Sequence, residues 1–180
     1  KAVSARIVHK SDVGGVKLGI EGDAAVRQAC DEIAAAARTA GVAELDGFLV
    51  TQMWRADTEL IAGVQRDPDF GPLVMVGAGG VLVELLTDVA LLPAPVDALS
   101  ARRAVEALKI APLLKRYRGR GPLDVDAVVD TVVRLSWLAH DLAAQGAGSD
   151  FEIEINPLKV RLQGQGVVAV DARARIDQAS

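Results

Sequence analysis

The opening residues of the chain combine a histidine, a lysine and paired glycines in a pattern suited to phosphate chemistry. His9 stands directly before a polar loop that ends in Gly14 and Gly15. Adjacent glycines in a hairpin loop let backbone N–H groups converge on an anion, because no Cβ obstructs the approach. Lys1 and two further lysines supply positive charge, and a neutral imidazole can act as a nucleophile near pH 7. By residue type alone, a simple turn beside a structural histidine remains the more common explanation.

A second group of polar residues lies near the C-terminus, in a segment otherwise typical of a β-strand. Glu152, Glu154 and Asn156 would share one face of that strand, because side chains alternate. Carboxylate and amide oxygens are hard ligands that suit Mg²⁺. Asp171 would lie across from them if the next strand forms a hairpin, and Pro157 would end the first strand at the site. A solvated edge of the sheet is the alternative interpretation.

A third group is Gln52, Met53 and Glu59, which stand at the end of one expected strand and the start of the next. Backbone groups at such a junction can pair with the edge of an adenine, and a carboxylate can accept hydrogen bonds from ribose hydroxyls. The spacing alone is a weak signal. Glu84 also stands out, since an acidic residue between apolar neighbours of an expected strand suggests a role in a site.

Apolar periodicity and turn residues predict the elements that would position these groups. Helices are expected at 23–39, capped by Asp23, at 99–108, and at 125–144, capped by Asp124. Strand pairs mixed with helices, without regular βαβ alternation, predict an α+β fold with a largely antiparallel sheet. The expected strands are 2–8, 16–20, 47–53, 59–64, 73–76, 81–86, 151–160 and 167–176, with the first two forming a hairpin.

Composition places the chain among folded domains. Its 180 residues are 51% hydrophobic and 24% charged, as in an ordinary packed domain. The formal net charge of −4 argues against a nucleic-acid partner, because backbone phosphates need a basic surface. The single cysteine, Cys30, allows no internal disulfide and fits a reducing, cytoplasmic location. Glycines and acidic residues interrupt the longest apolar stretch, so no membrane span is expected.

Four motifs, in order along the chain, resemble those of the nucleotide-binding part of nucleoside-diphosphate-forming acyl-CoA synthetases. The first is His9-Lys-Ser-Asp-Val-Gly-Gly-Val16, and the second is Arg66-Asp-Pro-Asp-Phe-Gly-Pro72. The third is Gly77-Ala-Gly-Gly80 followed by Val83-Glu84, and the fourth is Glu154-Ile-Asn-Pro-Leu158 with Asp171-Ala-Arg173. The motifs cover nearly the whole chain, and the resemblance raises the phosphate interpretation above the structural one.

The resemblance implies an ATP-grasp fold, with nucleotide held between two α+β lobes. The family's reaction reversibly converts acyl-CoA, phosphate and ADP into the free acid, CoA and ATP. Phosphate passes through a histidine on the CoA-binding part to the nucleotide, and in some members a second histidine relays it; His9 resembles that second histidine. ATP or ADP and Mg²⁺ are the implied cofactors, and the CoA-binding domain or subunit of the same enzyme is the implied partner in an oligomeric assembly.

The resemblance also implies roles for individual residues. One departure is Leu92, which stands where the family usually has an arginine, and this puts one phosphate-side contact in doubt. The implied positions are His9 for the relay, Lys1, Gly14 and Gly15 for the nucleotide phosphates, Asn156, Asp171 and the helper Glu154 for Mg²⁺, and Gln52, Met53 and Glu59 for adenine and ribose.

We expect residues 1–180 to form a single ATP-grasp domain that is incomplete at its N-terminus, because the chain begins at the lysine matched to the nucleotide phosphates. We expect the CoA-binding and ligase domains to lie outside these residues, so this part of an acid–thiol ligase should not catalyse the full reaction alone. One alternative is a synthetase-like regulatory domain of a bacterial protein-lysine acetyltransferase. Another is an ATP-grasp ligase that joins a carboxylate to an amine or thiol through an acyl phosphate and needs no relay histidine.

Overall fold

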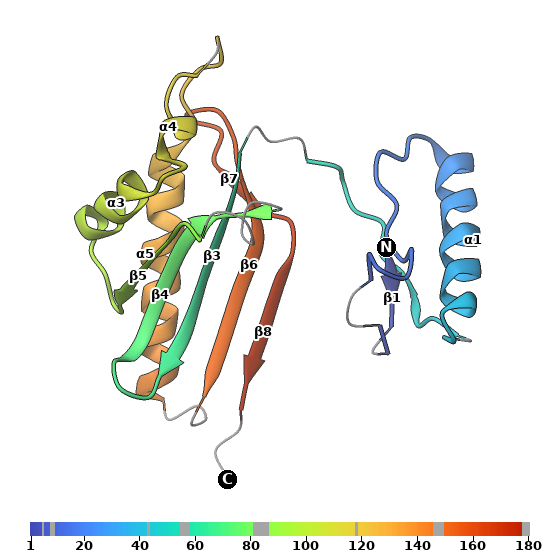
Figure 1. The fold of residues 1–180 in the computed structure, drawn as a ribbon, viewed down its shortest axis with the longest axis horizontal. Coiled ribbons are helices and arrows are strands. Elements are labelled where there is room, and N and C mark those ends of the chain that lie inside the picture. The colour runs from blue at the N-terminus through green and yellow to red at the C-terminus, as the bar shows by residue number, and fades with distance from the viewer. Residues whose placement is uncertain are drawn as a thin grey trace. The chain divides into compact units, whose positions relative to one another are not determined.

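The chain folds into two compact units, Lys1–Met53 and Trp54–Ser180. The computed structural model describes residues 1–4, 6–7, 10–42, 44–54, 58–80, 87–117, 119–145 and 150–177 (Figure 1). Within these ranges, no helix is both long and apolar enough to cross a membrane. That the two units together make one incomplete domain stays a prediction.

In the part of the first unit that the structure describes, there are one amphipathic helix and two short strands (Figure 1). Helix α1 spans Asp23–Thr39, the predicted range, but Gly22 is its N-cap and Asp23 is its first residue, where the negative charge suits the helix dipole. Strand β1 (Ala2–Val3) pairs antiparallel with β2 (Gly47–Phe48). The expected hairpin between 2–8 and 16–20 is wrong, since residues 16–20 form no strand and β1 pairs instead with β2, which follows α1.

The second unit contains a six-stranded sheet in which all neighbouring strands are antiparallel, as the α+β prediction requires. The strand order is β5-β4-β3-β6-β7, and β8 also pairs with β6 (Figure 1). β5 is not among the expected strands, because prolines at 93 and 95 obscure its short alternation. The bounds are β3 Thr58–Asp67, β4 Gly71–Ala78, β5 Val89–Pro93, β6 Phe151–Val160, β7 Val167–Ala169 and β8 Ala172–Ile176.

These bounds agree with the expected strands in part. β6 matches its expected range, β3 and β4 extend beyond theirs, and the expected strand 167–176 is two strands, β7 and β8. The expected strand 81–86, which includes Glu84, lies outside the described residues. The turn of the second motif joins β3 to β4, where Asp67 Oδ1 accepts hydrogen bonds from the N–H groups of Asp69 and Phe70 at 2.9 Å each. That motif is therefore explained by hairpin geometry.

Among the described residues of the second unit, three helices cover one face of its sheet (Figure 1). They are α3 (Ala98–Ala107), α4 (Ala111–Leu114) and α5 (Val125–Ala144), and the prediction for α5 and its Asp124 cap is confirmed. The carboxylate of Asp124 accepts from Ala127 N–H at 3.2 Å and from Gly166 N–H at 2.7 Å, so it ties the start of α5 to the turn before β7.

The main core lies between these helices and the sheet. Alternate strand residues point into it, such as Leu60 and Val64 of β3 and Val74 of β4, and they meet Val128 and Val132 of α5. The intervening residues therefore point to the other side of the sheet, which we call the open face.

A β-bulge interrupts this alternation in β6. Ile155 pairs with Ala62 and Leu158 with Leu60, so two residues of β6 stand opposite the single residue between these partners on β3. Those two residues, Asn156 and Pro157, are joined by a cis peptide bond. The prediction that Pro157 ends the strand is wrong, because β6 continues to Val160. The interpretation as a sheet edge is also wrong, since β6 pairs on both sides.

Candidate functional site

The open face of the second unit is divided between apolar and charged residues. On β5, Val89 and Leu91 are 42% and 55% exposed, while the alternate residues Ala90 and Leu92 pack against the core. On β6 and β8, the residues of the open face include Glu152, Glu154, Arg173 and Arg175, all of which are charged and at least partly exposed. Leu92, the departure from the family pattern, lies opposite Val74 on the helix-covered side, where a leucine suits its surroundings.

Asn156 and Asp171, the expected metal ligands, lie side by side at one end of this face. The backbone N–H of Asn156 donates to the carbonyl oxygen of Asp171 at 3.1 Å, as the expected hairpin requires. Asn156 Oδ1 accepts from the N–H of Gly80 at 3.1 Å. The side chain of Asn156 is thereby tied to the glycines of the third motif, Gly79 and Gly80, which we call the glycine loop, and Asp171 is exposed beside it.

The glycine loop also packs against Glu59 at the start of β3. The N–H of Gly79 donates to the carbonyl oxygen of Glu59 at 2.9 Å. Gly80 has a φ of +60°, and a Cβ on it would collide with the Glu59 carboxylate. The left-handed φ favours glycine at position 80, and a larger residue there would also displace the end of the Glu59 side chain.

Lys159 completes this corner of the unit, and it was not among the expected site residues. Its Nζ lies 3.2 Å from Glu59 Oε1 and donates to the carbonyl oxygen of Trp54 at 2.8 Å. Strict alternation from Asn156 would place Lys159 on the helix-covered side. The bulge reverses the phase of β6, and only this reversal puts Lys159 on the open face with Glu59.

These residues fit a magnesium ion that arrives with a phosphate ligand. Asn156 Oδ1 retains a second lone pair, and Asp171, whose backbone pairs with that of Asn156, carries a carboxylate with Oδ1 accepting from Ala172 N–H at 3.1 Å. Among the described residues, no three His, Cys, Asp or Glu side chains come close enough to hold a metal by themselves. Mg²⁺ commonly binds through one or two protein oxygens together with water and substrate phosphates, so this donor set suits it.

The predicted phosphate loop belongs to the first unit. The N–H of Gly15 donates to the carbonyl oxygen of Lys10 at 2.7 Å, and the N–H of Gly14 donates to the carbonyl oxygen of Ser11 at 3.2 Å. Both donors are therefore engaged within the loop. A Cβ on Gly15 would come within 2.8 Å of the same Lys10 oxygen, which explains a glycine there on packing grounds. The phosphate role of the loop stays a prediction, and His9 lies outside the described residues.

The remaining expected residues of the first unit are Lys1, Gln52 and Met53. Lys1 and Met53 line a cavity of about 120 Å³ whose walls are mostly apolar and include Ile33 of α1. Gln52 is exposed and does not line it. The cavity therefore brings together two of the three residues.

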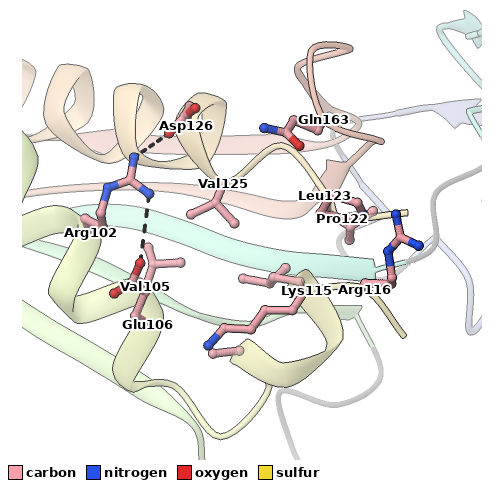
Figure 2. Close-up of a pocket in the computed structure, with 12 residues that line it drawn as sticks. Arg102, Val105, Glu106, Lys115, Arg116, Pro122, Leu123, Val125, Asp126 and Gln163 are labelled. Atoms are coloured by element: carbon pink, nitrogen blue, oxygen red, sulfur yellow. Dashed lines mark hydrogen bonds and ion pairs between the residues drawn. The ribbon is translucent and has the colours of Figure 1, made fainter. Parts of the chain in front are cut away.

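A larger cavity of about 270 Å³ lies in the second unit between α3, α4 and the start of α5 (Figure 2). Arg102 forms ion pairs there with Asp126 and, at 3.9 Å, with Glu106. Lys115 and Arg116 also line it. None of the expected site residues does.

Comparison with known proteins identifies the family. Residues 1–176 match the model of the ATP-grasp domain. The chain is 38% identical to the beta subunit of acetate–CoA ligase [ADP-forming] I from Pyrococcus furiosus, over 96% of this chain and 72% of that subunit. It is 40% identical to acetate–CoA ligase [ADP-forming] I from Archaeoglobus fulgidus, over 93% of this chain.

Solved structures of the dinucleotide-forming acetyl-coenzyme A synthetase 1 from Ca. Korarchaeum cryptofilum also match. The complex with coenzyme A, Ca-AMPCP and HgCl⁺ gives a TM-score of 0.84 at 36% identity, over 96% of this chain and 72% of that one. The complex with coenzyme A and Mg-AMPPCP, with a phosphohistidine segment pointing towards the nucleotide binding site, gives 0.78 at 34% identity, over 98% and 75%.

The chain covers only part of its relatives: 24% of the Archaeoglobus fulgidus enzyme and 25% of a trans-feruloyl-CoA synthase with which it shares 39% identity. The matched part nevertheless includes almost all of the chain, in sequence and in fold. The chain belongs to the ATP-grasp domain family, as a beta-subunit-like domain of the ADP-forming acetate and acyl-CoA ligases.

Proposed function

We propose that this chain is the nucleotide-binding part of an ADP-forming acyl-CoA synthetase and moves a phosphoryl group between a phosphohistidine and ADP. The observation that carries the proposal is the junction of Asn156 and Asp171 beside the loop at Gly80. It brings together oxygen ligands of the kind that Mg²⁺ uses together with substrate phosphates. A related enzyme in complex with Mg-AMPPCP supports the same assignment.

In this proposal Asn156 and Asp171 hold Mg²⁺. The ion, when bound, neutralises charge on the nucleotide phosphates. Glu59 accepts hydrogen bonds from the ribose, and Lys159 keeps its carboxylate in place. Lys1 provides a positive charge for phosphate oxygens, while Gln52 and Met53 face the adenine, and Gly14 and Gly15 belong to the loop that covers the phosphates.

His9 is the proposed relay. A ring nitrogen of His9 forms a bond to phosphorus as the bond between phosphorus and the phosphohistidine of the CoA-binding part breaks, which returns that histidine to its neutral form. An oxygen of the ADP β-phosphate then bonds to the same phosphorus, and the His9 bond breaks. His9 is left unmodified, and no oxidant or water is consumed.

The relay is tested in the complete synthetase by trapping labelled phosphate on histidine. The chain has two histidines, so His140 provides a matched control. His140 lies on α5, partly exposed, with its ring against Trp137. We expect His9→Ala to abolish label on this domain and to stop turnover, and His140→Ala to leave both unchanged. Unchanged turnover in His9→Ala would contradict the relay.

Nucleotide binding is tested separately by calorimetry with Mg-ADP. We expect Asn156→Ala and Asp171→Asn each to weaken Mg-ADP about 10- to 100-fold, with little effect on ADP measured without Mg²⁺. Binding of Mg-ADP without turnover by the complete protein would instead favour the regulatory alternative. The CoA-binding part as partner, an oligomeric assembly and a cytoplasmic location are also part of the proposal.

A further inference from the structure

Paired side chains form a ladder on the open face between β6 and β8. The residues stand directly opposite one another, and successive pairs on the same face are two residues apart along each strand. The first pair is the proposed metal site, and the other two each join an acid to an arginine. The pairs are Asn156 with Asp171, Glu154 with Arg173, and Glu152 with Arg175.

The two arginines of this ladder differ in their surroundings. Arg175 contacts three carboxylates: Asp150 at 2.7 Å, Asp177 at 3.6 Å and Glu152 at 3.9 Å. The hydrogen bond to Asp150 is the main reason that the pKa of Arg175 lies above its ordinary value. Arg173 makes no side-chain ion pair or hydrogen bond with any residue that the structure describes. Arg175 is thus engaged in holding the strands together, and Arg173 is available.

Arg173 also lies close to the proposed metal site. It follows Asp171 by two residues on the same strand direction, so their Cα atoms are about 7 Å apart, a distance that an extended arginine side chain covers. Across the strand pair is Glu154, and on the far side of Glu154 is Gly63, which has no side chain. Glu154 therefore has Arg173 as its cross-strand charge partner on this face.

We propose that Arg173 binds the phosphate groups of the nucleotide held at Asn156 and Asp171, and that Glu154 positions its guanidinium. A guanidinium presents paired N–H donors that match phosphate oxygens, which suits this position better than a lysine would. The assignment rests on the proposed function. It also changes the role of Glu154, which acts on Arg173 instead of helping to bind the metal.

The test measures Mg-ADP and adenosine affinity of the complete protein by calorimetry. Arg175→Gln is the matched control, because it removes the same charge from the same strand and face. We expect Arg173→Gln to weaken Mg-ADP about 10- to 100-fold and Arg175→Gln less than about twofold. Neither variant should alter adenosine affinity, since adenosine carries no phosphate. Arg173→Lys should recover only part of the affinity.

A Glu154→Gln, Arg173→Gln double variant separates two causes of weak binding. If Arg173 contacts phosphate, the double variant stays as weak as Arg173→Gln. If the single variant is weak only because an unpaired Glu154 repels the nucleotide, the double variant regains wild-type affinity and the proposal is overturned. Equal losses for adenosine and Mg-ADP would likewise overturn it, because they would show a structural effect.

Failure of this assignment can be distinguished from failure of the proposed function. If the unaltered protein does not bind Mg-ADP, the proposed function fails. If it binds Mg-ADP and Arg173→Gln behaves like Arg175→Gln, the nucleotide site stands and only the role of Arg173 is refuted. Glu154→Gln adds a further readout. The Mg²⁺ concentration needed for ADP binding should stay unchanged in this variant, and an increase in that concentration would indicate that Glu154 helps to bind the metal.

Discussion

Substitution of Gly80 by alanine tests the corner at which the glycine loop, Glu59 and Asn156 meet. The new Cβ would collide with the Glu59 carboxylate, and relief of the collision would move either Glu59 or the loop. Movement of the loop would break the hydrogen bond from Gly80 N–H to Asn156 Oδ1. We therefore expect Gly80→Ala to lower both stability and Mg-ADP affinity.

The magnitude follows from separate contributions. An alanine at the left-handed φ of Gly80 costs about 1–2 kcal/mol, and loss of the hydrogen bond to Asn156 adds about 0.5–1.5 kcal/mol. Gly164→Ala is the control, because Gly164 has a φ of +80° and nothing within 4 Å of the added Cβ. Gly164→Ala should therefore lose only the stability that an alanine costs at a left-handed φ.

Urea unfolding gives the two free-energy changes, and calorimetry with Mg-ADP gives the affinities. Gly80→Ala should be less stable than Gly164→Ala by about 0.5–1.5 kcal/mol. Only Gly80→Ala should bind Mg-ADP more weakly. If the two variants have equal stability and equal affinity, the close contact between the loop and Glu59 does not support the site, and the reasoning is refuted.

Two further predictions concern the helix caps of the second unit. Asp124→Ala removes a buried carboxylate that accepts from two N–H groups, and it should lower the free energy of unfolding in urea titrations by about 2–4 kcal/mol. Asp124→Asn should lower it by less. A decrease below about 0.5 kcal/mol for Asp124→Ala would contradict the assigned cap. The pKa of Asp97 is lowered, chiefly by the hydrogen bond from Ser100 N–H, so its stabilising contribution is complete above the unfolded pKa of about 4 and is lost as pH falls through the folded value. The stability difference between the unaltered protein and Asp97→Ala should accordingly narrow below about pH 4, and a difference independent of pH would argue against this cap.

The elements most accurately predicted from sequence are those with long, local signals. α5 has its apolar stripe and its Asp124 cap within one continuous segment, and β6 has its alternation and aromatic start. The hairpin expected at the N-terminus failed because the partner of β1 is β2, a strand too short to leave a periodic signal. Pairing between distant short strands depends on tertiary packing, which local patterns do not contain.

The site was predictable in part for the same reason. Alternation and hairpin pairing were enough to bring Asn156 and Asp171 together, and the structure places them side by side. Lys159 was missed because the face of the sheet on which it lies depends on the bulge in β6. No residue pattern in this segment predicts the shift in side-chain alternation that the bulge causes. The tie between Asn156 and Gly80 joins residues 76 positions apart, so only the folded sheet reveals it.

The extra residue in β6 makes the spacing of this segment sensitive to length. Ile155 and Leu158 both point into the core because two residues stand between them, where a regular strand would have one. Deleting Pro157 would therefore carry Leu158 and Val160 out of the core and turn Lys159 inward. If a relative lacks one residue at this point, we expect a compensating insertion nearby. Without such an insertion, we expect that relative not to bind nucleotide at this site.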